Sequence, residues 1–149
     1  MTDAQNSETA PTERFRPYVA VAVLCEKVLR EADGVLSAIR IVDRFFVSGP
    51  TPQMPPGNIL TNLLIILKSG FFKGKAKVRV TPRTPDNQRM PELSFDQLFE
   101  GDDRGVAIIA QFAFPVAEEG LYWLDIAFEQ DVLTSIPMRV VYRQVSTRE

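Results

Sequence analysis

The sequence predicts an all-β fold, an antiparallel β-sandwich of about seven to nine strands. Turn signals rich in Gly, Pro, Asp and Asn recur about every 10–17 residues, a spacing typical of short strands. Between these turns, apolar and polar residues alternate with a period of two in several segments. After residue 35 no stretch shows a convincing helical pattern. These observations together point to a sandwich or a barrel.

Eight strands are predicted. The first is expected at 18–26, because the β-branched run YVAVAV at Tyr18–Val23 favours extended structure and the Asp-Gly pair ending at Gly34 marks a hairpin turn. Between Val21 and Ala32, however, apolar residues also recur at helical spacing, with charged residues opposite them. That window therefore stays open between a strand and an amphipathic helix. The other strands are expected at 34–47, 58–68, 72–82, 92–99, 105–115, 120–129 and 133–144.

Alternation supports the later strands. KAKVRV, from Lys75 to Val80, sets basic residues on one face against Ala and Val on the other. The segment Ser48–Asn58 carries four prolines, so we expect a stiff loop that is either a strap between sheets or a docking segment for another protein. Strands and turns of this kind are typical of Ig-like sandwiches with Greek-key connections. In LYWLDIAF a single face carries Tyr122, Leu124, Ile126 and Phe128.

A single domain is expected, because the chain has 149 residues and domains cluster near this length. Residues 1–16 are polar with almost nothing to bury, so we expect a disordered tail before a β-sandwich domain at 17–144 and a short tail at 145–149. The net charge of −2 is too small to indicate nucleic acid or an anionic membrane as a partner. No segment has the pattern of a membrane span or a secretory signal, and a cytoplasmic protein is expected.

The chain contains no histidine and a single cysteine, which excludes several kinds of chemistry. Ser-His and Cys-His catalysis, histidine acid–base catalysis and the usual zinc sites all need these residues. The cysteine, Cys25, lies beside Glu26, whose charge disfavours a thiolate. In a strand the two side chains also point to opposite faces. Cys25 is therefore interpreted as a packing residue, and neither enzymatic activity nor a cofactor is expected.

The residues around Cys25 carry a resemblance. The segment VLCEKVLREADGVLSAIRIVDRF resembles the N-terminal signature of a bacterial family of small proteins known only as a domain of unknown function. In that signature an apolar strand ends in Cys and an acidic residue, a turn with Gly follows, and then come Ser-apolar-Ile and an Asp. The resemblance implies a β-sandwich and no known activity. The matching positions are Cys25, Glu26, Gly34, Ser37, Ile39 and Asp43.

Carboxylates collect in loops that we expect at one end of the domain. Successive loops of an antiparallel sheet alternate between its two ends, which groups the turns at 30–34, 69–71, 100–105 and 129–132. Ca²⁺ takes six to eight oxygen ligands, and such loops can supply them. The alternative is a set of solvated polar loops. The residues that could bind the cation are Asp102, Asp103, Glu129 and Asp131.

A basic stripe is expected on one face of the strand at 72–82. Spaced cations beside aromatic rings can bind phosphate groups or an acidic protein. Lysines on a solvent-facing strand are also an ordinary protection against edge-to-edge aggregation. The residues of this possible interaction surface are Phe71, Phe72, Lys73, Lys75, Lys77 and Arg79.

The function that these observations favour is a non-catalytic binding or assembly module that recognises another protein or associates with itself. Ca²⁺-dependent binding through the acidic loops is the first alternative. A carboxylate-based hydrolase is the second, since it needs only two acidic side chains at a suitable separation. The adjacent pairs Asp102–Asp103 and Glu118–Glu119 are expected at opposite ends of the domain, which argues against such an enzyme.

Overall fold

The computed structural model describes residues 15–146, and in this range it contains strands and no helix. Most of the N-terminal tail predicted at 1–16, and the end of the predicted C-terminal tail, lie outside the described residues. The strands are β1 (Tyr18–Arg30), β2 (Leu36–Val42), β3 (Arg44–Gly49), β4 (Gly57–Lys68), β5 (Lys73–Arg83), β6 (Leu93–Glu100), β7 (Gly105–Val116), β8 (Gly120–Phe128) and β9 (Asp131–Gln144).

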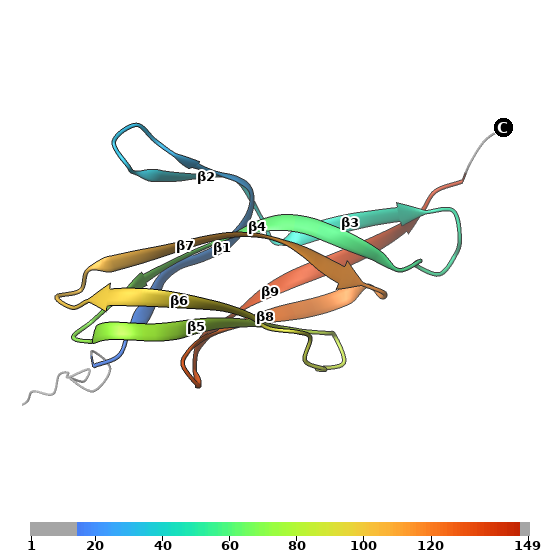
Figure 1. Ribbon diagram of the computed structural model, residues 1–149. Coiled ribbons are helices and arrows are strands. Elements are labelled where there is room, and N and C mark those ends of the chain that lie inside the picture. Colours follow the sequence, from blue (N-terminus) through green and yellow to red (C-terminus); the bar gives the residue numbers. More distant parts are fainter. Residues whose placement is uncertain (1–14, 147–149) are drawn as a thin grey trace, which may run out of the picture.

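The nine strands form two sheets that pack face to face (Figure 1). Sheet A has the order β2-β1-β4-β7, and sheet B has the order β3-β9-β8-β5-β6. The hairpins β1–β2, β5–β6 and β8–β9 stay within one sheet, while every other connection crosses between the sheets. All strand pairs are antiparallel except β3–β9, which is parallel. The all-β sandwich predicted from the sequence is confirmed, with this one parallel pair as an addition.

The strand predicted at 34–47 is in fact two strands that belong to different sheets. β2 pairs with β1 in sheet A, whereas β3 pairs with β9 in sheet B. Between them the Arg139 N–H donates a hydrogen bond to the Asp43 carbonyl at 2.9 Å, which fixes the crossing point. The sequence hides this switch because both halves are apolar and extended, so the strand pattern continues across Asp43 without a Gly or Pro turn signal.

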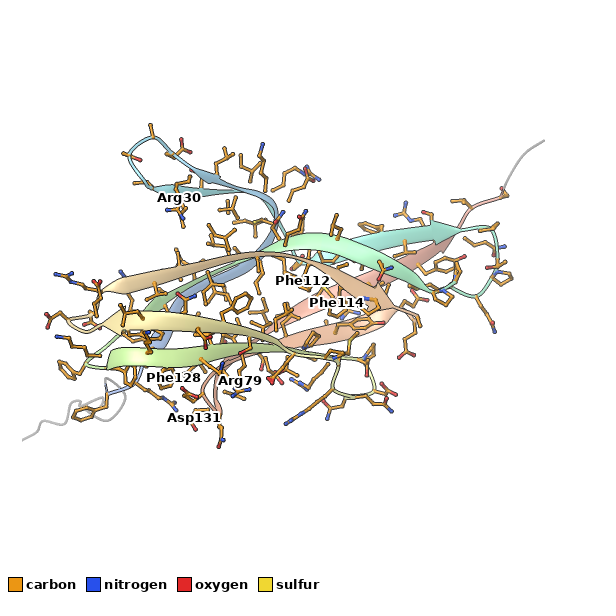
Figure 2. All side chains as sticks on the ribbon, viewed as in Figure 1. Arg30, Arg79, Phe112, Phe114, Phe128 and Asp131 are labelled. Atoms are coloured by element: carbon orange, nitrogen blue, oxygen red, sulfur yellow. The ribbon has the colours of Figure 1, made fainter. Side chains whose placement is uncertain are left out.

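β1 settles the choice between strand and helix in the window from Val21, because it is extended as far as Arg30. Its first half pairs with β4 and its second half with β2. The hairpin made by this second half and β2 projects away from the packed sheets, and Arg30 lies out on it (Figures 1 and 2). Gly34 lies in the turn at the tip of this hairpin with a φ of +88°, a backbone conformation that residues other than glycine rarely adopt.

The core lies between the sheets and consists of the inward-facing residues of each strand. β8 contributes the face that alternation predicts, Tyr122, Leu124, Ile126 and Phe128. At one end the rings of Phe72, Phe99 and Phe128 meet edge to face, with centroids 5.0–5.8 Å apart. Phe112 and Phe114, labelled with Phe128 in Figure 2, continue the aromatic packing along β7. Edge-to-face contacts of this kind add to the stabilisation from burial.

The proline-rich segment between β3 and β4 connects sheet B to sheet A. β9 and the residue after it hold this segment in place. The Tyr142 hydroxyl donates to the Thr51 carbonyl at 2.6 Å, and the Gln144 amide donates to the Pro50 carbonyl at 3.1 Å. The Val145 N–H donates to the Gly49 carbonyl at 2.8 Å. Of the two interpretations of this loop, the structure agrees with the strap between sheets.

Candidate functional site

Cys25 is completely buried at the point where β1 leaves β4. Burial raises the pKa of its thiol above the ordinary value, and a hydrogen bond from the Lys27 backbone only partly offsets this effect. Glu26 is exposed and forms an ion pair with Arg40 at 2.7 Å, so it does not activate the thiol. The surroundings of Cys25 therefore favour the protonated thiol, which is a poor nucleophile.

The four acidic residues predicted to bind a cation fall into two separate groups. Asp102 and Asp103 lie in the β6–β7 turn, whereas Glu129 and Asp131 lie in and beside the β8–β9 turn. The first turn follows Glu100, which pairs with Lys73 on β5, while Glu129 accepts a hydrogen bond from the backbone N–H of Lys77 at 3.1 Å. Lys73 and Lys77 are four residues apart on β5, which corresponds to roughly 13 Å. The two acidic groups are therefore attached at different heights of the strand.

No group of three or more potential ligand side chains among residues 15–146 is placed to hold a metal ion. Asp131 instead lies 3.7 Å from the Arg16 guanidinium. The two carboxylate pairs of the hydrolase alternative, Asp102–Asp103 and Glu118–Glu119, lie beyond opposite ends of β7, which is 12 residues long. Such a strand spans roughly 40 Å, so the two pairs are far too distant to act on one bond.

The basic stripe lies on the outward face of sheet B, but its charges are partly paired. Lys77 forms an ion pair with Asp96 at 2.9 Å, and Arg79 forms one with Glu92 at 3.0 Å. Lys73 and Lys75 are exposed. A shallow hollow of about 570 Å³ beside the stripe is lined by both signs of charge, from Lys75, Lys77, Arg79, Asp96 and Glu129.

The two phenylalanines before the stripe have different environments. Phe72 packs against the core, in edge-to-face contact with Phe99 and Phe128, so it does not belong to a surface. Phe71 is exposed, and its ring contacts Phe15 with centroids 5.8 Å apart. The structure therefore does not bring the aromatic rings and the basic stripe into one binding surface.

A surface that the sequence analysis missed is the outward face of sheet A. The strand register aligns its side chains in rows across three strands: Val21, Ile66 and Ala107 form one row, and Val23, Leu64 and Ile109 form the next. A third row holds Cys25, Asn62 and Gln111, and Leu60 lies beside Ala113 beyond it. We call the apolar members of these rows the apolar face: Val21, Val23, Leu60, Leu64, Ile66, Ala107, Ile109 and Ala113.

Exposure of the apolar face changes along β4 and from β4 to β7. Leu64 is only 4% exposed and Cys25 is fully buried, whereas Ile109 on β7 is 41% exposed and Leu60 is 66% exposed. Two side chains of β4 hold the backbone of β1 in place near Cys25. Thr61 donates a hydrogen bond to the Cys25 carbonyl at 3.3 Å, and Asn62 donates one to the Glu26 carbonyl at 2.8 Å. The apolar face is therefore buried at Leu64 and open to solvent at Leu60 and at Ile109 on β7.

The sequence did contain a signal for this face. β4 carries Leu60, Leu64 and Ile66 at outward positions as well as a run of apolar residues at inward ones, and every outward residue of β7 is uncharged. A half-exposed strand normally alternates apolar and polar residues, so uniform apolar character indicates a strand that is covered on both faces. Here the described residues of the chain leave the β7 side of this face uncovered.

No protein-family model matches the chain, and no curated protein matches it. Among solved structures, the chain is similar to an immunoglobulin-like protein from Pseudomonas aeruginosa, with 14% identity and a TM-score of 0.42 over 85% of this chain and 97% of that one. It is also similar to the C-terminal domain of Wzt, with 15% identity and a TM-score of 0.41 over 84% of this chain and 73% of that one. The likeness of the Cys25 segment to a bacterial family stays a resemblance. Within residues 15–146 no helix is long and apolar enough to cross a membrane.

Proposed function

We propose that this protein is a non-catalytic binding module, and that the apolar face is the surface through which it binds another protein or a second copy of itself. The observation that carries the proposal is the contrast between exposure and charge on this face. Leu60 and Ile109 are exposed, and the rows around them contain no charged side chain. Exposed Leu and Ile side chains on an uncharged sheet face are typical of sites that another molecule covers.

The neighbouring hairpin adds exposed apolar residues among charged ones, such as Lys27 opposite Ile39. Val35, Ile39 and Ile41 are exposed on the β1–β2 hairpin. Among the described strands, β2 pairs with β1 alone. The hairpin and the apolar face belong to one sheet, so a partner that binds the face can also reach the hairpin. Burial of exposed Leu and Ile side chains is the main favourable term in most associations between proteins.

The surface is also preorganised for binding. Leu64 and Cys25 are already buried in its interior, and the side chains of Thr61 and Asn62 are hydrogen-bonded to the β1 backbone. A rigid surface loses little conformational entropy when it binds, which raises affinity without new contacts. These features support a surface that keeps its shape rather than one that forms only on contact.

Site-specific photocrosslinking in cells tests this proposal. A photoreactive phenylalanine analogue at position 60 is expected to form a covalent adduct with whatever protein covers the apolar face. The matched control is the same analogue at position 98, because Leu98 is similarly exposed, at 57% against 66% for Leu60, but lies on the outward face of sheet B. Adducts at position 60 and not at 98 support the proposal. Equal labelling at both positions, or none at position 60, would overturn it.

A further inference from the structure

The four edge strands of the two sheets differ in one respect. β2, β3 and β6 are 6–8 residues long and each carries charge, in the form of Arg40, Arg44, and Asp96 with Glu100 respectively. β7 is 12 residues long and carries no charged residue at all. Short length and charged side chains are the devices by which edge strands avoid pairing with other chains. β7 lacks both of these protections. It has one other, Pro115 near its end, which has no N–H to offer a neighbouring strand.

One side of β7 is fully paired and the other is not. All twelve of its residues, from Gly105 to Val116, are in register with β4. Among the described residues no strand pairs with its opposite side, so the backbone N–H and C=O groups there face outward. Such a row is a template for one more strand, and here it borders the open part of the apolar face.

We propose that β7 pairs antiparallel with β7 of a second copy of the chain, so that two sheets A become one eight-stranded sheet with a continuous apolar face. This inference rests on the proposed function and names the partner. The absence of charge on β7 favours a second copy as the partner. In a two-fold contact the same surface of both copies meets, so any charged residue near the axis would lie close to its own like charge. An uncharged strand has no such repulsion to overcome.

The register of this pair follows from backbone geometry. Residues that face each other in an antiparallel ladder must both be hydrogen-bonded to their partner or both be non-bonded. The two-fold axis therefore passes at a residue of β7 and not between two residues. We place it at Ala110, near the middle of the strand, because this register pairs nearly the whole length of β7. On the outward face this sets Ala107 opposite Ala113 of the second copy and Ile109 opposite Gln111.

Sedimentation of the purified full chain tests the association. The expected result is a reversible dimer of twice the 16.7 kDa chain mass. Ile109→Glu combined with Gln111→Glu places four carboxylates directly against one another across the axis, and this variant is expected to be monomeric. The matched control, Ser94→Glu with Leu98→Glu on the edge strand β6, is expected to stay dimeric. Circular dichroism and a thermal melt establish that both variants fold.

Three outcomes would overturn the inference. They are a wild-type chain that is monomeric at every concentration, a chain that grows into open-ended polymers, and a dimer that both double variants leave intact. If the carboxylate variant does not fold, a pair of cysteine variants still decides. Ala107→Cys mixed with Ala113→Cys is expected to give a disulfide-linked heterodimer, because facing residues have Cα atoms about 4.5–5.5 Å apart. Neither variant alone is expected to form a disulfide-linked dimer. Crosslinking in every combination would contradict the register.

Failure here is distinguishable from failure of the proposed function. A monomeric chain that still forms adducts of another mass through position 60 in cells keeps the binding function and loses the second copy as partner. A dimer that crosslinks only at its own doubled mass supports both statements. A monomer without adducts removes both.

Discussion

The outward face of sheet B and the outward face of sheet A present opposite surfaces on the two sides of one sandwich. On sheet B, three basic residues of β5 pair with carboxylates, and the most buried of these pairs joins Arg83 to Asp125 at 2.7 Å. On sheet A, the rows from Val21–Ile66–Ala107 to Leu60–Ala113 carry no charge, and they range from buried at Leu64 to exposed at Leu60. Water satisfies the first face, whereas the second is favourable in water only when something covers it.

The comparison also separates two ways in which a surface contributes to the protein. A charged outward face keeps the chain soluble and contributes little to stability unless its ion pairs are partly buried. An apolar outward face stabilises the fold only where neighbouring side chains already bury it. The remaining exposed part contributes to stability in a complex, not in the isolated chain.

The largest expected change in unfolding free energy comes from a comparison of two leucines of the apolar face. Leu64→Ala removes a side chain that is 4% exposed and is expected to cost about 2–4 kcal/mol of unfolding free energy. Leu60→Ala removes one that is 66% exposed and is expected to change it by less than about 0.5 kcal/mol. Urea unfolding under dilute conditions measures both. Equal losses would show that Leu60 is covered even in the isolated chain, and would remove the open side of the face.

The sequence predicted sheet B better than sheet A, for a physical reason. β5 alternates between basic and apolar residues, so the outward positions of Lys75 and Lys77 follow from a period of two. In β8 the outward Asp125 marks the opposite face from the inward Tyr122. β4 has apolar residues on both of its faces, so its sequence does not predict which face lies in the core. The exposed face was therefore missed, although its residues are plain in the sequence.

The other errors concern where strands go and not whether they exist. The crossing of the chain from sheet A to sheet B at Asp43 involves neither Gly nor Pro, so a single Asp is the one turn residue that marks it. The alternation of loops placed the acidic turns at one end, but it could not reveal the offset between β8 and β6 along β5. That offset separates Asp102 from Glu129, and only strand register determines it.

A smaller effect is expected within sheet B, at Asp125. Burial tends to raise the pKa of this carboxyl, but hydrogen bonds from Arg83 and from the Ser135 hydroxyl at 2.5 Å outweigh it, and the pKa lies below its ordinary 3.8. Asp125→Asn is expected to cost about 1–2 kcal/mol near neutral pH, because it removes charge-assisted hydrogen bonds. Urea unfolding measures this loss.

The pH dependence of that stabilisation follows from the direction of the shift. A carboxyl whose folded pKa is depressed stabilises the fold fully above its unfolded pKa, near 3.8, and the stabilisation is lost as the pH falls through the lower folded value. The wild type is therefore expected to lose more stability than Asp125→Asn when the pH falls below about 4. Parallel curves for the two proteins over this range would show that the Arg83–Asp125 pair contributes nothing.

The smallest effect is expected at the exposed pair on the same face, Lys77 with Asp96. Lys77 lowers the pKa of the Asp96 carboxyl through a hydrogen bond and its charge, but the Asp96 side chain is 78% exposed, against 17% for Asp125. Water and salt screen such a pair, so Asp96→Asn is expected to leave the melting temperature unchanged at low and at high salt. A loss as large as that of Asp125→Asn would make the charges of sheet B a source of stability. Without such a loss, the role that remains for Lys77 and Asp96 is to keep the β6 edge solvated and unpaired.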